Sequence, residues 1–529
     1  NIVPITRPPL GSTSTSSMDM INSAVSLAIA LVFAAVIITK IARGRTTTVD
    51  PPSCNSLLPP PVVTGSSILG LLHTLLRKGF RGMIQEQYTK LGSVFTISFF
   101  GLKTTFLIGP EVSAHFFTGL ESEISHGNTL EFTVPMFGKG VSFGADIATR
   151  TEQNRFYVDA LKPSKLRCHV GPMLEEVEKY FAKWGQRGTV DLKHEVDQLL
   201  MLISARCLLG NEVRERMFED VFSTFNELTE NGLHITSLLF PYALTPFTLR
   251  RDRAHARLSK IFNEIVRSRK SSSNKVEEDV LQNLIDSKYK DDRPTTEAEV
   301  TGLILLILFA GKHTSANSSM WTGARLLSHA QCLKAAIKEQ EQIINKNAGQ
   351  VDYNTLGEMS ILHCCIKEAL RMHPPAVAFF RKANKSFTVR TREGYEYEIP
   401  RGHTLVSPLV MNHSLPYIYK DPDLYDPDRF GLGREEDKVG GKFTYTAFGA
   451  GRHPCPGEAY AYMQVKAIWS YLLRNFELKL VSPFPKTDWR NFALGPKGDM
   501  MVSYKRRQLA ARGHAGKVDD QLCINCINV

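Results

Sequence analysis

The hydrophobic pattern of the chain opens with one long uncharged run. No charged residue occurs from Met20 to Thr39; a helix of about twenty residues is roughly 30 Å long, which matches the hydrocarbon core of a bilayer. Lys40, Arg43 and Arg45 follow, and basic residues favour the cytoplasmic side. We therefore predict a single membrane span with the rest of the chain in the cytosol. A cleaved signal peptide is the alternative, although this run exceeds the usual apolar length of such peptides.

The same pattern divides the chain into segments of different character. We interpret them as a disordered or extraneous amino end (1–17), a membrane anchor (18–42), a Pro-rich hinge (43–65), one large folded body (66–507) and a disordered tail (508–529). Proline cannot continue a helix, so the hinge is expected to be a semi-rigid extended spacer.

Two stretches of the body have the β-branched and aromatic content of strands. Ser93–Ile108 predicts a hairpin that turns at Gly101. Phe387–Val406 predicts a second hairpin that turns at Glu393 and Gly394. Both hairpins would give small sheets.

Helical patterns dominate the remainder. The clearest helix opens at Thr296, three residues before Glu299, which is the spacing of a capping box. It continues through VTGLILLILFAGKHTSANSSMWTGARLL and is apolar on nearly every face, so it should run buried through the centre of the domain. Ser271–Glu278 is the best candidate for an exposed loop. The body is predicted to be mainly α, an α+β fold with small sheets at the side.

Composition narrows the function classes. The chain has 529 residues, is 43% hydrophobic and carries a formal charge of +11, but no basic stripe is interleaved with aromatic residues, which argues against nucleic acid. A membrane surface and acidic protein partners fit this charge better. Nine cysteines without a paired framework indicate reduced thiols in a cytosolic environment.

One of these thiols stands in an unusual setting, the sequence FGAGRHPCPG at residues 448–457. Gly449 and Gly451 allow a tight loop, and the helical pattern from Gly457 onward places Cys455 at a helix amino terminus. A helix amino terminus favours an anion and lowers a thiol pKa, which gives a thiolate suited to metal. A lone cysteine is otherwise most often a small packed hydrophobe.

The spacing around this cysteine resembles a known signature. The motif Phe-x-x-Gly-x-Arg-x-Cys-x-Gly stands at Phe448, Gly451, Arg452, Cys455 and Gly457. It resembles the haem-binding loop of the cytochrome P450 superfamily. The resemblance implies haem b bound to iron through Cys455, with Phe448 beside the sulfur and with Arg452 and His453 on the haem propionates.

A second stretch supports the resemblance through charge. Glu368 and Arg371 lie three residues apart on one predicted helix face, and Arg429 follows in YDPDRF. Alone, such a pair is usually a solvated surface pair. The superfamily's Glu-x-x-Arg core implies a structural role in folding for all three.

A third stretch, AGKHT at residues 310–314, lies in the central helix. In the superfamily, small residues here leave room for dioxygen over the iron, and Thr314 supplies a hydroxyl that relays a proton. Without the thiolate loop, AGKHT could be ordinary helix sequence and His313 a satisfied core histidine.

His313 before Thr314 points to one branch. Together with EALRMHPP and the following Arg381, it is similar to the sterol 14α-demethylases, plant obtusifoliol 14α-demethylases in particular. The resemblance implies three successive oxygenations of a sterol methyl group, electrons from NADPH through NADPH-cytochrome P450 reductase, and a single-pass location in the endoplasmic reticulum membrane. Arg381 and Arg155 would contact haem propionates, although a surface helix cation is the alternative for Arg155.

Departures from the branch concentrate where substrate would bind. The residues expected to line the pocket are Leu130, Phe132, Ile147, Leu306, Ala310, Lys312, Ala376, Phe379 and Met500. Because the haem and folding motifs stay intact, the alternative to the sterol reaction is a divergent member that hydroxylates or epoxidises a pentacyclic triterpene such as β-amyrin. A reductase-independent isomerase is a third class, which the presence of Thr314 disfavours.

Overall fold

The computed structural model describes residues 58–63, 66–99, 101–127, 129–271, 278–489 and 493–507. The predicted span Met20–Thr39, most of the hinge, the loop after Ser271 and the tail from residue 508 lie outside them. Within the described residues, no helix combines the length and the apolar character that crossing a membrane requires.

The chain folds into two compact units, which we call the smaller and the larger unit. The smaller unit contains the described residues up to Phe116 with Leu120–Ser125 and Phe380–Val406, and the larger unit contains Phe117–Gly119, His126–Phe379 and the described residues from Ser407.

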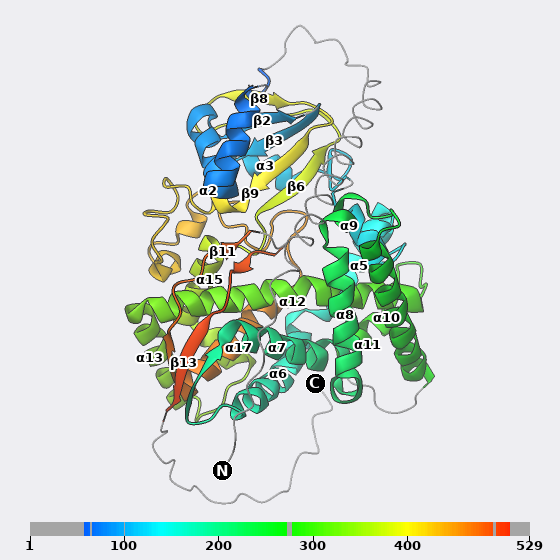
Figure 1. Ribbon diagram of the computed structural model, residues 1–529, viewed down its shortest axis with the longest axis vertical. Helices are drawn as coiled ribbons and strands as arrows, with labels where there is room; N and C mark the ends of the chain where they lie inside the picture. The colour runs from blue at the N-terminus through cyan, green and yellow to red at the C-terminus, as the bar shows by residue number, and fades with distance from the viewer. Residues whose placement is uncertain are drawn as a thin grey trace, which may run out of the picture. The chain divides into compact units, whose positions relative to one another are not determined.

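A six-stranded sheet dominates the smaller unit. Its strands, in spatial order, are β1 (Val62–Val63), β2 (Val94–Phe99), β3 (Leu102–Leu107), β9 (Thr404–Pro408), β6 (Ala378–Ala383) and β4 (Ile124–Ser125). Strands β2 and β3 are antiparallel, and Gly101 between them has φ 79°, so the first predicted hairpin is confirmed. The helices of this part of the chain are α2 (Ser66–Leu91), which packs on β2, and α3 (Pro110–Thr118) (Figure 1).

The second predicted hairpin is shorter than expected. Strands β7 (Phe387–Arg390) and β8 (Glu396–Ile399) pair around Gly394, which has φ 91°. The chain then turns at Gly402, φ 89°, and β9 leaves the hairpin to pair in parallel with β3. The positive φ at Gly402 redirects the strand, because a non-glycine residue would be strained there.

The larger unit is mainly helical, as the pattern predicted. Its longer helices are α5 (Ile147–Ala160), α6 (Pro163–Ala182), α7 (Leu192–Ser204), α8 (Phe218–Gly232), α10 (Pro246–Ser271), α12 (Glu297–Ser328), α13 (Ala330–Lys346), α15 (Ser360–Met372) and α17 (Glu458–Asn475). Short helices are α4 (Val134–Phe137), α9 (Ile235–Leu239), α11 (Val280–Asp286), α14 (Tyr353–Glu358) and α16 (Leu409–Asn412). The small sheets contain β10 (Phe476–Leu480), β13 (Met501–Arg506) and β5 (Arg187–Asp191), and β11 (Thr487–Asp488) with β12 (Gly495–Pro496).

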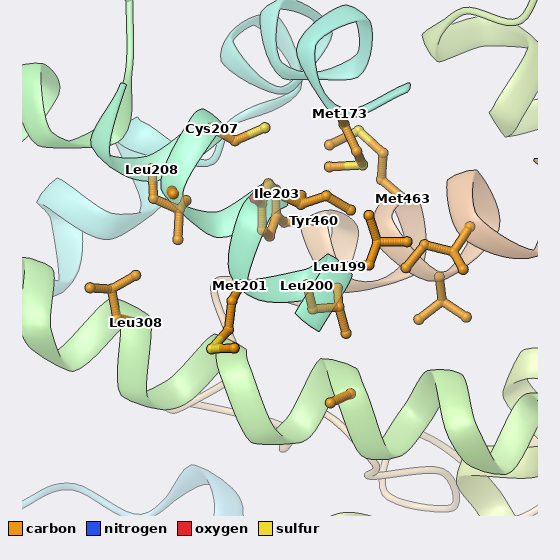
Figure 2. Close-up of a cluster of buried hydrophobic side chains, with 14 of the residues drawn as sticks. Met173, Leu199, Leu200, Met201, Ile203, Cys207, Leu208, Leu308, Tyr460 and Met463 are labelled. Carbon is orange, nitrogen blue, oxygen red and sulfur yellow. The ribbon is translucent and has the colours of Figure 1, made fainter. Parts of the chain in front are cut away.

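Helix α12 runs across the larger unit (Figure 1). It begins with the predicted capping box, in which the N–H of Glu299 donates to Thr296 Oγ1 and the N–H of Thr296 donates to the Glu299 carboxylate. Helices α7, α10, α15 and α17 pack along it, which explains why its sequence is apolar on nearly every face. Figure 2 shows Met173, Leu199 and Met463, from α6, α7 and α17, in the core beside α12.

Helices α12 and α17 approach each other most closely at a glycine. A Cβ on Gly323 would lie 2.2 Å from the ring of Trp469, so only glycine leaves room for the indole. Trp469 is fully buried, and its Nε1 donates to the Ser319 carbonyl at 3.0 Å. Burial of an aromatic side chain of this size typically contributes about 3–5 kcal/mol to stability.

Candidate active site

The segment 448–457 forms a tight loop directly before α17. The N–H of Cys455 donates to the Phe448 carbonyl at 2.7 Å, which closes the loop. Gly451 has φ 64°, and a Cβ there would lie 2.1 Å from the Phe117 carbonyl oxygen. The loop conformation therefore requires glycine at residue 451.

The thiol of Cys455 is in reach of solvent, although protein atoms surround it on most sides. Desolvation raises the pKa of Cys455 and the charge of Glu458 acts in the same direction, whereas a backbone hydrogen bond from Gly457 lowers it. Helix α17 begins at Glu458 with Gly457 as its N-cap, so the thiol precedes the first helical turn. The predicted lowering of this pKa by the helix terminus is wrong, because desolvation outweighs it. A metal cation at the sulfur would deprotonate it directly.

The AGKHT stretch interrupts the burial of α12. Ala310 and Thr314 are exposed and Gly311 is half-buried, and residues four apart share one helix face. A Cβ on Gly311 would meet no atom within 4 Å. Thr314 Oγ1 donates to the Ala310 carbonyl at 2.6 Å. We call this the open face of α12, a hydroxyl-bearing face in an otherwise packed helix.

The open face is tied to the helix that follows the cysteine loop. Ser315, next to Thr314, donates from Oγ to Gln464 Oε1 of α17 at 2.9 Å, and both side chains are buried. The hydroxyl of Thr314 and the thiol of Cys455 therefore belong to segments whose helices are fixed to each other.

Lys312 does not share the open face. It is 7% exposed, and its Nζ donates to Asn226 Oδ1 of α8 at 2.6 Å. Burial lowers the pKa of Lys312, while the charges of Asp197 and Glu230 act in the opposite direction. The side chain, which was predicted to line a substrate pocket, is thus directed into the packing between α12 and α8.

His313 is half-buried beside it. Burial lowers the pKa of His313 below its ordinary value of about 6.5, the charge of Lys312 lowers it further, and Asp197 opposes both. The imidazole is therefore neutral at pH 7.

Glu368 and Arg371 of α15, Arg429 and Glu436 form a buried group that we call the charge cluster. Arg371 Nε donates to Glu368 Oε2 at 2.7 Å, and Arg429 Nε donates to Glu368 Oε1 at 2.9 Å, with all three side chains 0% exposed. Arg429 also pairs with Glu436. Arg371 donates to two backbone carbonyls at 2.7 Å each. The structure thus joins the three residues that the sequence analysis grouped, with Glu436 as a further carboxylate.

The loop residues next to the cysteine have distinct settings. Phe448 packs against Tyr462 of α17, with 5.2 Å between the ring centroids. Arg452 is exposed, and its backbone N–H donates to the Phe117 carbonyl at 2.9 Å. The ring of His453 is half-buried. The loop backbone is therefore fixed while the guanidinium of Arg452 remains accessible.

The other two cations predicted to contact propionates have polar contacts of their own. Arg381 belongs to the smaller unit, is 8% exposed and donates to the Phe380 carbonyl at 2.9 Å. Arg155, on α5, pairs with Glu152 at 3.1 Å and donates to the Lys288 carbonyl at 2.7 Å. These contacts of Arg155 are those of a surface helix cation, the alternative that its sequence context allowed.

The remaining residues predicted to line the pocket are Leu130, Phe132, Ile147, Leu306, Ala376, Phe379 and Met500. Leu306 and Ala310 are four apart on α12, and Leu306 is half-buried. Leu130, Phe132, Ala376 and Phe379 are buried or half-buried in the larger unit. Ile147 begins α5 and is 55% exposed, whereas Met500 is fully buried in the hydrophobic core.

Three residues that the sequence analysis did not single out shape the site. Asn226 holds Lys312, Phe117 anchors the cysteine loop through its carbonyl, and Glu436 completes the charge cluster. The acidic sequence GREEDK at residues 433–438, shortly after Arg429, is a signal that could have indicated a second acidic partner for this arginine. A backbone carbonyl such as that of Phe117 leaves no signal in the sequence.

The residues of the loop fit a haem held by one axial thiolate. Cys455 offers one soft donor atom on a rigid loop, and a Cβ on Gly457 would lie 3.7 Å from its sulfur. Arg452 and His453, which shortly precede Cys455 in the sequence, supply a cationic group and a hydrogen-bonding group. One sulfur ligand on a fixed loop is the ligation typical of haem-thiolate proteins.

Known proteins are similar to this chain over most of its length. The family model for cytochrome P450 matches residues 59–502. Obtusifoliol 14-alpha demethylase of Sorghum bicolor is 52% identical over 450 residues, 85% of this chain and 91% of that protein. Sterol 14-demethylase of Arabidopsis thaliana is 51% identical over 453 residues, 86% and 92% of the two chains. Lanosterol 14-alpha demethylase of Homo sapiens is 33% identical over 427 residues, 80% and 82% of the two chains.

A solved structure shares the fold. The retinoic acid bound cyanobacterial CYP120A1 has a TM-score of 0.72 with 22% sequence identity, and the match covers 86% of this chain and 100% of that one. The family match spans the cysteine loop, the open face of α12 and the charge cluster. The chain therefore belongs to the cytochrome P450 family and, within it, to the sterol 14-demethylases, which are haem-dependent monooxygenases.

Proposed function

We propose that this protein removes the 14α-methyl group of a plant sterol of the obtusifoliol type. The methyl group would be oxidised to the alcohol, then to the aldehyde, and then lost as formate, each step consuming one dioxygen and two electrons. The observation that carries this proposal is the 52% identity to the Sorghum bicolor obtusifoliol enzyme across 91% of its length. Electrons would come from NADPH through NADPH-cytochrome P450 reductase.

The cysteine loop would hold the haem. Cys455 Sγ would ligate the iron, Phe448 would pack beside the sulfur, and Arg452 with His453 would neutralise the propionates. Arg381 is a further candidate for a propionate contact, and Arg155 a weaker one because its guanidinium is already engaged. When bound, the haem supplies the activation of dioxygen. The protein's contribution would be to hold the sulfur in place through the short loop backbone, while the bound metal cation would keep the sulfur deprotonated.

Thr314 would deliver protons on the open face of α12. Its Oγ1 donates to the Ala310 carbonyl at 2.6 Å, so the hydroxyl hydrogen is held until rotation about the side chain releases it toward the open face. Ala310 and Gly311 leave space beside the hydroxyl for the substrate and dioxygen. His313 is neutral at pH 7 and half-buried, which makes it a secondary proton carrier behind Thr314.

The proposed reaction needs a membrane-dissolved substrate. We expect a single-pass anchor in the endoplasmic reticulum membrane at residues 18–42, with the catalytic body in the cytosol. The formal charge of +11 suits both anionic lipid and an acidic reductase.

A second candidate is oxidation of a pentacyclic triterpene such as β-amyrin by hydroxylation or epoxidation. Lys312 favours it, because a buried ammonium between Ala310 and Thr314 in the sequence is one of the departures from the sterol 14α-demethylases. A reductase-independent isomerase is disfavoured by Thr314, since such enzymes do not need the hydroxyl. Turnover that requires NADPH and reductase would separate the isomerase from both oxygenases.

A yeast strain without its own sterol 14-demethylase provides the test. The full chain should restore growth and sterol composition, and Cys455→Ser should not. Failure of rescue by well-expressed protein, whose ferrous carbon monoxide spectrum shows thiolate ligation, would refute the sterol reaction. Conversion of β-amyrin by the same preparation would then establish the triterpene alternative.

A further inference from the structure

The contact between Lys312 and Asn226 joins α12 to α8 in the larger unit. Figure 1 labels both helices. Lys312 Nζ donates to Asn226 Oδ1 at 2.6 Å, and the lysine is 7% exposed. Among the residues that the structure describes, Lys312 forms no ion pair; the charges of Asp197 and Glu230 act on it from a longer range. The ammonium is thus held by a neutral amide in a buried position.

Such an arrangement is costly for stability alone. Burying an ammonium group without a paired carboxylate loses hydration that one neutral hydrogen bond does not restore. An apolar side chain would fill the same volume at lower cost. The link is therefore better explained by where it holds α8 than by its contribution to the free energy of folding.

The direction of Lys312 excludes direct contact with a ligand on the open face. Residues two apart on an α-helix point about 200° apart, so Lys312 lies opposite both Ala310 and Thr314. This agrees with the exposure of those two residues and the burial of Lys312. Lys312 must act through the helix that it holds.

Helix α8 connects this link to a segment predicted to line the pocket. At its carboxyl end, a Cβ on Gly232 would lie 2.6 Å from Met136 Sδ of α4. Helix α4 directly follows the short turn that contains Phe132. On its other side, α4 touches α12, where a Cβ on Gly302 would lie 2.1 Å from the Phe137 carbonyl oxygen. A displacement of α8 is therefore transmitted to α4 and to Phe132.

We propose that Lys312 is a positioning residue for substrate selection, which uses its hydrogen bond to Asn226 to set the placement of α8 against α12. This inference rests on the proposed oxidation of a sterol or triterpene. It assigns selectivity to a residue that the bound ligand does not touch. Substitution of Lys312 should therefore change the relative affinities for different polycyclic ligands and not the rate of the oxygenation step.

The test uses the holoenzyme and four variants. Ligand dissociation constants are measured from the substrate-induced spectral shift with obtusifoliol, lanosterol and β-amyrin. Lys312→Gln and Asn226→Leu should each change the ratio of sterol to triterpene affinity by about tenfold, roughly one charge-assisted hydrogen bond. The double variant should match the single variants, because both remove the same link. KM should change more than kcat.

Lys466→Gln is the matched control. Lys466 is also 7% exposed, and its Nζ also donates to a neutral acceptor, the Leu356 carbonyl, at 2.8 Å. It lies on α17, and this hydrogen bond joins α17 to α14. Lys466→Gln should alter stability while leaving the affinity ratio unchanged.

The outcomes separate the two proposals. If wild-type protein with normal thiolate ligation binds none of the three ligands, the proposed function fails. If the wild type binds but Lys312→Gln and Lys466→Gln give the same affinity ratio as the wild type, the positioning role is overturned. Additive effects of Lys312→Gln and Asn226→Leu would overturn it as well, since they would then act independently.

Discussion

The charge cluster and the AGKHT stretch of α12 both place polar groups in the larger unit, but they satisfy those groups in opposite ways. In the charge cluster, Glu368 accepts hydrogen bonds from two arginines, and each arginine has further carboxylate or carbonyl acceptors. In α12, the hydroxyl of Thr314 donates within its own helix turn and to no other residue that the structure describes, and the ammonium of Lys312 has a neutral partner.

This difference separates folding from function. A buried charged group whose hydrogen bonds are all formed is fixed in place and has no donor or acceptor left for a ligand. A hydroxyl that can exchange its acceptor, on a face with open space, can move a proton. In the proposed function, the region with all its hydrogen bonds formed would support the fold, and the region with Thr314 would support the chemistry.

The largest expected effect on stability comes from removing one arginine of the charge cluster. Arg371→Met would leave Glu368 with one fewer cation at 0% exposure, and an uncompensated buried charge costs about 3–5 kcal/mol. We expect little folded protein and loss of haem incorporation, measured as haem per polypeptide and by urea unfolding.

Arg434→Met is the control for this change. Arg434 touches the same cluster through Glu436, but its side chain is 39% exposed, so the loss should be below about 1 kcal/mol. Equal losses for Arg371→Met and Arg434→Met would contradict the importance of burial in the cluster.

The second prediction concerns Thr314 on the open face of α12. Thr314→Ala should lower product formation by about 100-fold, the range for loss of a proton-transferring group, while NADPH oxidation continues. The product formed per NADPH consumed is the measurement. The protein should keep its thiolate spectrum, because the hydroxyl is exposed.

Thr322→Ala supplies the comparison on the same helix. Thr322 Oγ1 donates to the Ser318 carbonyl at 2.7 Å, as Thr314 does to Ala310, but Thr322 is fully buried. Its substitution should cost about 1 kcal/mol of stability and leave the product per NADPH unchanged. A drop in both variants would show that the helix, and not the hydroxyl on the open face, controls coupling.

The smallest expected effect is a pH dependence of stability. It arises from the buried Lys466, which among the described residues lacks the carboxylate partners that the arginines of the charge cluster have. Burial lowers the pKa of Lys466 to about 8, against the charges of Glu339 and Cys364, while the unfolded value is about 10.4. The cost of burying the charge is fully present below pH 8 and is relieved as the pH rises toward 10.4. Wild-type stability should therefore rise relative to Lys466→Gln across this window, by about 1–3 kcal/mol. A constant difference in urea midpoints between pH 7 and 10 would refute the shifted pKa.

The features that the sequence predicted have dense local signals. The capping box at Thr296, the hairpin around Gly101 and the Phe-to-Gly spacing of the cysteine loop each depend on residues within a few positions of one another. The grouping of Glu368, Arg371 and Arg429 relied on a family resemblance instead, and the structure supplied its contacts.

The features that were missed depend on long-range packing. Lys312 is 86 positions from Asn226, and nothing near either residue indicates that they meet. The departure of β9 from the second hairpin follows from its pairing with β3, on a distant part of the chain. The pKa of Cys455 depends on how many atoms surround the sulfur, which local sequence does not encode. Partner identity and desolvation are therefore the quantities that required the structure.

The contact of Gly323 with Trp469 has a consequence for motion. Since no Cβ fits between the indole and α12, and since Trp469 also holds the Ser319 carbonyl, these two helices cannot slide or tilt without losing both contacts. The conformational fluctuations that admit a bulky lipid must therefore be carried by segments other than α12 and α17. Amide hydrogens at the Gly323 crossing should exchange with solvent only through global unfolding.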